Sequence, residues 1–145
     1  MKQNTMEMVI QVEDKTEIER LLSILSLGLC AALEQGALSI EAAERYLYSP
    51  YTLELLQKLN ISPEVLQVVH LGTELEDVES LLPEKLGESL AEIKERSFKI
   101  LQTLPNSAAE QQWIQPEPLP NSLESSANEK PIATQPSKVY VAAHP

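Results

Sequence analysis

The sequence changes character at Pro105, and this change limits how much of the chain can fold. The residues before it are rich in leucine and in helix boundary signals, whereas the forty residues after it contain six prolines and mostly isolated apolar side chains. Nothing in this second part buries enough apolar surface to offset a backbone entropy cost of about 1–2 kcal/mol per ordered residue. We therefore predict a folded acidic helical domain over residues 1–105 and a disordered Pro/Ser/Gln-rich tail over residues 106–145.

The folded part is predicted to be mainly helical. Its first long helix begins near Asp14 or Thr16 and stops at Gly36, with a polar cap at one end and a glycine just past the other. Further caps and prolines predict later helices over residues 39–48, 50–60, 63–72, 73–82 and 83–104. Because the connections are short, we expect a compact bundle of five or six helices.

Two boundary signals in the middle of the chain shape this prediction. Gly72 is taken as the residue that stops one helix. The sequence Thr73-Glu74-Leu75-Glu76 has the pattern of a capping box, in which the Thr hydroxyl and a Glu carboxylate bond each other's free backbone N–H groups at the start of the next helix.

Residues 6–12 alternate apolar and polar side chains, which predicts a single N-terminal β-strand or extended arm. One strand needs a partner to form a sheet. Three arrangements stay open: pairing with a second copy through Met8–Val12 in a homodimer, pairing with the β-prone segment 138–142, or no pairing at all.

Charge and hydropathy exclude several classes of function. The chain has a net charge of −11, and residues 1–105 hold 18 acidic and 9 basic side chains. Binding to nucleic acid or to anionic lipid needs clustered basic residues, so we expect neither. The longest apolar stretch, residues 21–33, is shorter than the ~20 residues that span a bilayer. With one cysteine, Cys30, and acidic residues before the apolar stretch instead of a signal peptide, we expect a cytoplasmic protein.

Four carboxylates lie within six residues, at Glu74, Glu76, Asp77 and Glu79. Acidic residues are common in the first turn of a helix, so a solvated helix start is the simplest interpretation. A docking patch for a basic protein is the alternative, and a metal site lacks the oxygen-rich loop that Ca²⁺ binding needs. His70, four residues before Glu74, is interpreted as a partly exposed histidine near a helix C-terminus, because we expect the helix to end at Gly72 and so to separate the pair. A metal or small-ligand site at His70 is the alternative.

Aromatic residues mark two further candidate contacts. Tyr46, Tyr48 and Tyr51 cluster around a Ser-Pro pair and either fill a corner between short helices or form an interface. Trp113, the only tryptophan, lies in the predicted tail, where it is incidental or is a linear motif that docks on the domain or on another protein. Residues 139–141 could add a strand to a sheet edge.

The sequence contains no recognisable catalytic or cofactor motif. We searched for a Gly-rich phosphate loop, for a nucleophile with a base, and for convergent carboxylates, and found only four glycines, of which two are assigned to helix ends. We therefore expect no enzyme, no cofactor and no metal.

Several segments together resemble a known family. They are Leu27-Gly28-Leu29-Cys30, residues 41–45, Ser49-Pro50-Tyr51-Thr52 and the string from His70 to Glu79. In these segments the chain is similar to a family of short bacterial proteins known only as a domain of unknown function. The resemblance covers about residues 5–105, with the tail as an added extension, and it implies a small intracellular domain without assigning an activity.

These observations predict a non-enzymatic protein that acts through protein–protein contact, in a regulatory or adaptor-like role. The alternative is an acidic inhibitor, an immunity protein or antitoxin, that masks a basic partner such as a nuclease through the carboxylates at 74–79.

Overall fold

The computed structural model describes residues 6–106, 111–116 and 139–143. The chain divides into two compact units, one formed by Glu19–Pro105 and the other by the described residues of 1–18 and 106–145. The division falls within the first turns of helix α1, Lys15–Glu34. The mainly helical fold class and the N-terminal strand predicted from the sequence are confirmed.

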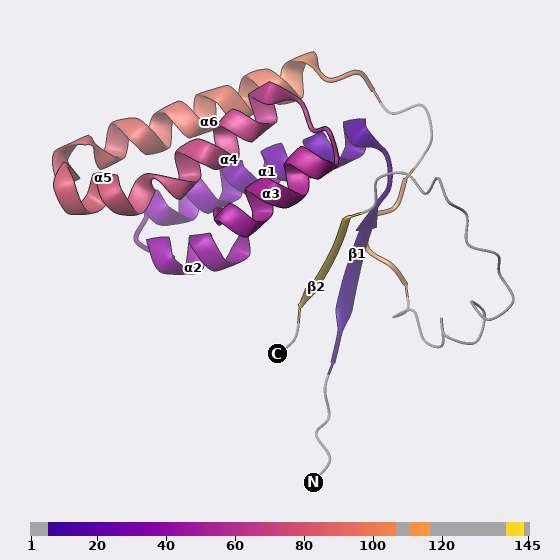
Figure 1. The fold of residues 1–145 in the computed structure, drawn as a ribbon. Helices are drawn as coiled ribbons and strands as arrows, with labels where there is room; N and C mark the ends of the chain where they lie inside the picture. The colour runs from indigo at the N-terminus through magenta and orange to yellow at the C-terminus, as the bar shows by residue number, and fades with distance from the viewer. Residues whose placement is uncertain (1–5, 107–110, 117–138, 144–145) are drawn as a thin grey trace, which may run out of the picture. The chain divides into compact units, whose positions relative to one another are not determined.

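In the unit Glu19–Pro105 two long helices accompany several short ones. The long helices are α1 and α6, Leu86–Thr103, with 20 and 18 residues. Helix α6 packs along α4 and α5, α4 also contacts α3, and α2 contacts α5 (Figure 1). The short elements are α2 (Ile40–Tyr46), α3 (Pro50–Lys58), α4 (Pro63–Thr73), α5 (Leu75–Leu81) and a 3-10 turn, Pro83–Lys85.

Several predicted helix boundaries are formed by the expected side chains. Asp14 Oδ1 accepts a hydrogen bond from the N–H of Glu17 at 2.9 Å, and Ser39 Oγ accepts one from the N–H of Ala42 at 3.0 Å. Gly36 follows α1 with a φ of 71°, a conformation that favours glycine. Short-range capping signals therefore placed these helix ends correctly.

The boundary between α4 and α5 differs from the prediction. Helix α4 continues through Gly72 to Thr73, and α5 begins at Leu75. Thr73 Oγ1 donates to the carbonyl oxygen of His70 at 2.6 Å. Glu74 occupies the N-cap position of α5, but its side chain makes no capping hydrogen bond to the backbone of α5, so the predicted capping box does not form. The capping box does not form because α4 extends through this segment: the N–H of Glu74 bonds the carbonyl of Leu71 in the last turn of α4.

The other unit contains a strand that is paired on both edges. Strand β1, Met8–Val12, is antiparallel to β2, Val139–Ala143, with Ile10 opposite Val141. A second segment also pairs with β1: the N–H of Gln11 donates to the carbonyl of Trp113 at 2.9 Å, and the N–H of Gln115 donates to the carbonyl of Val9 at 3.0 Å. Since amide and carbonyl groups alternate sides along a strand, this segment and β2 occupy opposite edges of β1.

The predicted tail contains two segments that pair with β1. Residues 111–116 and 139–143 pair with β1, and the pairing with the C-terminal segment is one of the three arrangements left open by the sequence. A second copy that paired with β1 would have to displace one of these two segments. The other residues predicted as disordered, 107–110, 117–138 and 144–145, lie outside the described residues.

None of the helices in the described part of the chain is both long enough and apolar enough to cross a membrane.

Candidate functional site

The predicted acidic residues form part of a larger surface. Glu76, Asp77 and Glu79 are exposed on α5, and Glu74 is exposed at its N-cap. Because α2 contacts α5, the carboxylates of α2 join them. We define the α2–α5 acidic face as these six residues: Glu41, Glu44, Glu74, Glu76, Asp77 and Glu79.

Like charges are crowded where the two helices meet. Partial burial raises the pKa of Glu44 above its ordinary value, and the charge of Glu76, a hydrogen bond with the Glu76 carboxyl group, and the charges of Glu41 and Asp77 raise it further. Two carboxyl groups can share a hydrogen bond only when one of them holds a proton. The fold therefore brings negative charges together that repel one another near neutral pH.

An apolar hollow lies beside these carboxylates. It has a volume of about 310 Å³, and its apolar lining consists of Leu33, Leu38 and Ile40 together with Leu86 and Leu90 of α6. Its acidic lining residues are Glu41, Glu76 and Glu79, and none of the residues that line it is basic. The hollow thus offers apolar contact and negative charge together.

Of the basic residues nearby, Arg45 on α2 stacks against the Tyr46 ring, and two lysines are paired with other carboxylates. Lys94 Nζ lies 2.7 Å from Glu34 Oε1, and Lys85 Nζ lies 3.7 Å from Glu88 Oε1. Within the residues that the structure describes, no ion pair reaches Glu41, Glu44, Glu76, Asp77 or Glu79.

His70 does meet Glu74, contrary to the prediction. Its Nε2 lies 3.3 Å from Glu74 Oε2, and both side chains are about half exposed. The i, i+4 geometry survives because α4 does not end at Gly72. In the described part of the chain no third His, Cys, Asp or Glu side chain joins them in a group that could hold a metal ion.

The three clustered tyrosines separate into two kinds. Tyr46 and Tyr51 are 59% and 74% exposed, whereas Tyr48 is 1% exposed. The guanidinium carbon of Arg45 lies 5.8 Å from the centre of the Tyr46 ring, within the range of a cation–π contact. Two of the three tyrosines are thus available on the surface, and Tyr48 belongs to the core.

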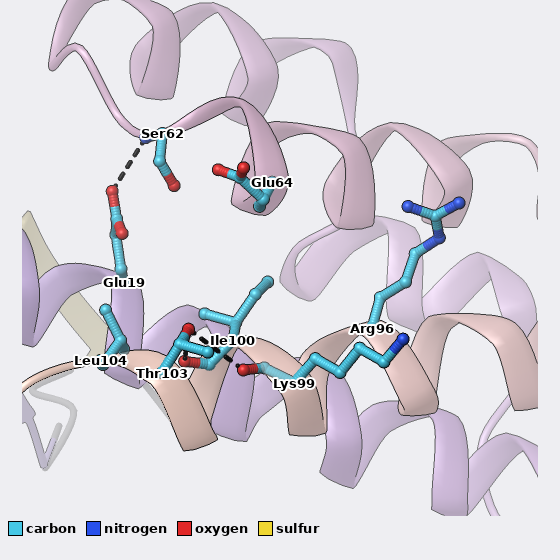
Figure 2. A pocket seen from close by; sticks show the side chains of 8 residues that line it. All are labelled: Glu19, Ser62, Glu64, Arg96, Lys99, Ile100, Thr103 and Leu104. Carbon is cyan, nitrogen blue, oxygen red and sulfur yellow. Dashed lines mark hydrogen bonds between the residues drawn. The ribbon is translucent and has the colours of Figure 1, made fainter.

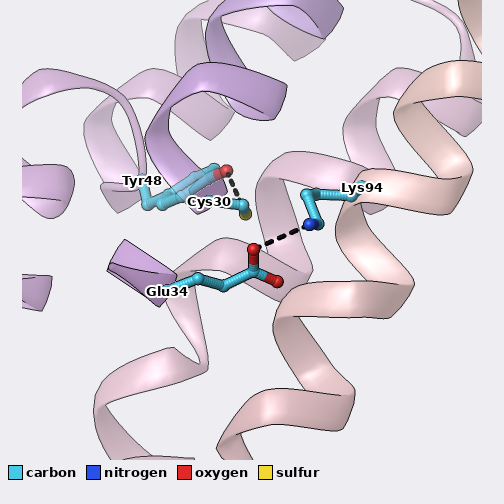
Figure 3. A network of polar contacts seen from close by, with 4 residues as sticks. All are labelled: Cys30, Glu34, Tyr48 and Lys94. Carbon is cyan, nitrogen blue, oxygen red and sulfur yellow. Dashed lines mark hydrogen bonds and ion pairs between the residues drawn. The ribbon is translucent and has the colours of Figure 1, made fainter. Parts of the chain in front are cut away.

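Tyr48 is at the centre of a buried polar cluster. Its hydroxyl bonds Ser26 Oγ and lies 3.5 Å from Cys30 Sγ (Figure 3). Burial, which desolvates the charged form, is the main cause that raises the pKa of both the Tyr48 hydroxyl and the Cys30 thiol. The Tyr48 ring lies so close to Gly72 that a Cβ atom there would overlap it. Gly72 is therefore required for close packing and does not stop the helix.

Trp113 contacts its own chain. The side chain is partly buried, its Nε1 donates to Glu17 Oε1 at 3.1 Å, and the neighbouring Gln111 Nε2 donates to Asp14 Oδ2 at 3.0 Å. These bonds hold residues 111–115 against β1 and the start of α1.

Sequence reasoning missed the contribution of α2 to the acidic face. The spacing of Glu41 and Glu44 places them on one side of a helix, which was visible in the sequence. The meeting of α2 with α5, and the hollow beside them, depend on long-range packing that no local pattern encodes.

The chain was compared with protein families, curated proteins and solved structures, and one family matches it. No curated protein and no solved structure gives a match to the chain. A family model described as "Protein of unknown function (DUF3969)" matches residues 13–115. The match takes in Trp113, beyond the limit at residue 105 expected from the sequence, and begins just after β1. Because it covers well over half of the chain, this protein belongs to the DUF3969 family.

Proposed function

We propose that this chain is a non-enzymatic binding module, adaptor-like or regulatory, whose α2–α5 acidic face holds a basic and partly apolar segment of another protein. An apolar side chain of that segment enters the 310 Å³ hollow. Lysine or arginine side chains beside it pair with the carboxylates at the rim.

The observation that carries this proposal is the position of unpaired carboxylates around an apolar hollow. Glu41, Glu76 and Glu79 line it without a basic neighbour among the lining residues. Crowded like charges destabilise a folded protein, and a cationic partner relieves their repulsion on binding. A purely solvated helix start explains the charges on α5 but not their convergence with those of α2 on one hollow.

Two exposed tyrosines are a separate candidate contact of the proposed module. Tyr46 lies on α2, two residues after Glu44, a spacing that points the two side chains to different sides of the helix, and Tyr51 lies in the first turn of α3. Tyrosine is enriched in protein interfaces because its ring is apolar and its hydroxyl is polar.

The test is affinity capture from native lysate with matched charge-reversal variants of the full chain. One variant carries Glu76→Lys and Glu79→Lys, within the face. The control carries Glu54→Lys and Glu95→Lys, at exposed positions on α3 and α6 outside it. Both variants change the net charge equally, so they separate a specific face from general acidity.

We expect a partner with a basic surface to be captured by the wild type and by the control, and to be lost from the face variant. High salt should also weaken its capture, because exposed charge pairs are screened. Equal capture by the two variants, or no specific partner with any of them, would refute the proposal.

An acidic inhibitor remains the second candidate, because closely spaced carboxylates at Glu74, Glu76, Asp77 and Glu79 can imitate nucleic-acid phosphates toward a basic nuclease site. All four are exposed, as this role requires. It predicts a toxin-like reading frame beside the gene and inhibition of that toxin by the purified chain. Reversal of all four charges without loss of binding would rule it out.

A further inference from the structure

A second and larger hollow lies between the start of α4 and the C-terminal half of α6. Its volume is about 420 Å³, within the range of small-molecule sites. Figure 2 shows Glu19 of α1 with Ser62 and Glu64 on one side, and Lys99 of α6 on the other. Ile100 and Leu104 add apolar lining, with Leu104 on the same side as Glu19. None of these residues belongs to the α2–α5 acidic face.

One wall of this hollow carries a buried carboxylate with spare hydrogen-bonding capacity. Glu19 is 5% exposed, and its Oε2 accepts a hydrogen bond from the N–H of Ser62 at 2.8 Å. Its Oε1 has no hydrogen bond to any residue that the structure describes. An ionised carboxylate accepts up to about four hydrogen bonds. Among the described residues, Ser23 Oγ is the only fully buried side-chain oxygen or nitrogen without a partner, so Glu19 Oε1 is accessible from the hollow.

The hydrogen bond from Ser62 explains why an acceptor lies at position 19, but it does not explain why this acceptor is charged. Ser62 is the N-cap residue of α4 but makes no side-chain cap bond, so the Glu19 carboxylate replaces it at the positive end of the helix dipole. A glutamine would supply the same acceptor without a charge. The charge itself, directed at a hollow, is suited to a cationic ligand group.

The opposite wall carries an unpaired cation. Arg96 is held by Glu92, with its Nε and its terminal nitrogen each 2.9 Å from Glu92 Oε2. Lys99 has no carboxylate within ion-pair distance among the described residues. The hollow therefore presents a carboxylate acceptor at one side and a cation at the other, with Ile100 and Leu104 as apolar lining.

We propose that this hollow binds a small molecule of amino-acid type that carries a cationic head and a carboxylate. The ammonium or guanidinium head donates to Glu19 Oε1, the carboxylate pairs with Lys99, and the aliphatic stem lies on Ile100 and Leu104. This site is independent of the protein partner proposed above.

Calorimetric titration of the full chain tests the ligand chemistry. The probes are L-arginine and L-lysine, their decarboxylated counterparts agmatine and cadaverine, and glutarate. We expect at least one of the two amino acids to bind, more tightly than its decarboxylated counterpart, and glutarate not to bind. Failure of both amino acids to bind, or equal binding of each amino acid and its amine, would overturn the proposal.

Variants test the residues. Glu19→Gln keeps an acceptor for the N–H of Ser62 and removes the charge, so the affinity should fall about tenfold to a hundredfold while the melting temperature changes little. Lys99→Met, at an exposed position, should weaken binding only about two- to fivefold. Lys58→Met on α3 is the matched control and should leave the affinity unchanged. An affinity that Glu19→Gln leaves intact would contradict the site.

Discussion

At the scale of single residues, the structure distinguishes side chains that the sequence presents as equivalent. Ser23 and Ser26 are both small, both on α1 and both buried, at 1% and 0% exposure. Ser26 bonds the Tyr48 hydroxyl, whereas Ser23 Oγ has no hydrogen-bond partner among the described residues. A comparison of the two serines therefore measures how much a hydrogen-bonded buried hydroxyl contributes to the free energy of unfolding.

Alanine at these two positions should have opposite effects. Ser26→Ala deprives the buried Tyr48 hydroxyl of its main partner and should lower the free energy of unfolding by about 1–3 kcal/mol. Ser23→Ala removes an unsatisfied buried hydroxyl and introduces a better helix former, so the free energy should stay equal or rise by about 1 kcal/mol. Urea unfolding followed by circular dichroism measures both, and equal losses would contradict the assigned bond.

Gly72 and Gly28 differ in the space that surrounds them, and this gives a second test. Gly72→Ala would place a methyl group against the Tyr48 ring, and overpacking of this kind costs about 1–3 kcal/mol. Gly28 also lies inside a helix, but a Cβ atom there meets nothing within 4 Å. Gly28→Ala should therefore stabilise the protein by up to about 1 kcal/mol.

The same urea unfolding experiment compares the two glycine variants. A stabilising Gly72→Ala would show that the Tyr48 ring does not pack on this helix. A double-mutant cycle of Gly72→Ala with Tyr48→Phe should show little coupling, because the ring, and not the hydroxyl, occupies the space.

At the scale of secondary-structure elements, the meeting of α2 and α5 creates a measurable repulsion. The pKa of Glu44 is raised in the folded protein, so the folded state holds this proton more strongly than the unfolded state does. Its contribution to stability is therefore present below the ordinary value of 4.5 and is lost as the pH rises through the raised value. The groups that face Glu44 are Glu41 on its own helix and Glu76 and Asp77 on α5.

Glu44→Gln should consequently raise the free energy of unfolding near pH 7, by an amount below about 1 kcal/mol because the site is partly exposed. The gain should shrink toward zero as the pH falls to 4.5, where the wild-type carboxyl group takes up its proton. Glu54→Gln, on the exposed surface of α3, serves as the control and should change little at either pH. Indistinguishable effects of the two substitutions at pH 7 would contradict the charge crowding.

The pairing of β1 predicts which amides are protected from hydrogen exchange. The N–H of Gln11 bonds the carbonyl of Trp113 and not β2. A variant that ends at residue 116 should therefore keep the Gln11 amide protected, and one that ends at residue 110 should expose it. Nuclear magnetic resonance reads this amide directly, and protection that persists in the variant ending at residue 110 would refute the pairing.

Elements with local signals were predictable from the sequence, and elements that depend on distant contacts were not. The caps at Asp14 and Ser39 and the stop at Gly36 are local, and they are correct. The end of α4 was misjudged because glycine serves equally as a helix stop and as a site of close packing. Whether the ring of Tyr48 lies over Gly72 is decided by tertiary contacts. The pairing of two tail segments could not be assigned from local patterns, because both pair with β1, which lies about a hundred residues or more away in the sequence.

At the scale of the whole molecule, ion pairs are unevenly distributed among the charged residues. The chain has a net charge of −11, and its basic residues near α6 are largely paired, while the α2–α5 acidic face has carboxylates without ion pairs among the described residues. A surface of this kind gives a binding protein selectivity for a basic partner and a faster association with it. The candidate site could be located in part from the string at 74–79, but its apolar hollow is a product of packing.

The central claim is that this face and its hollow are where a partner binds. Hydrogen–deuterium exchange of the full chain, compared with and without the partner captured in the charge-reversal experiment, tests it most directly. We predict slower exchange in the peptides that cover α2 and α5, and little change in those that cover β1 and residues 111–116. Unchanged exchange over α2 and α5, with protection confined to other segments, would contradict the proposed function.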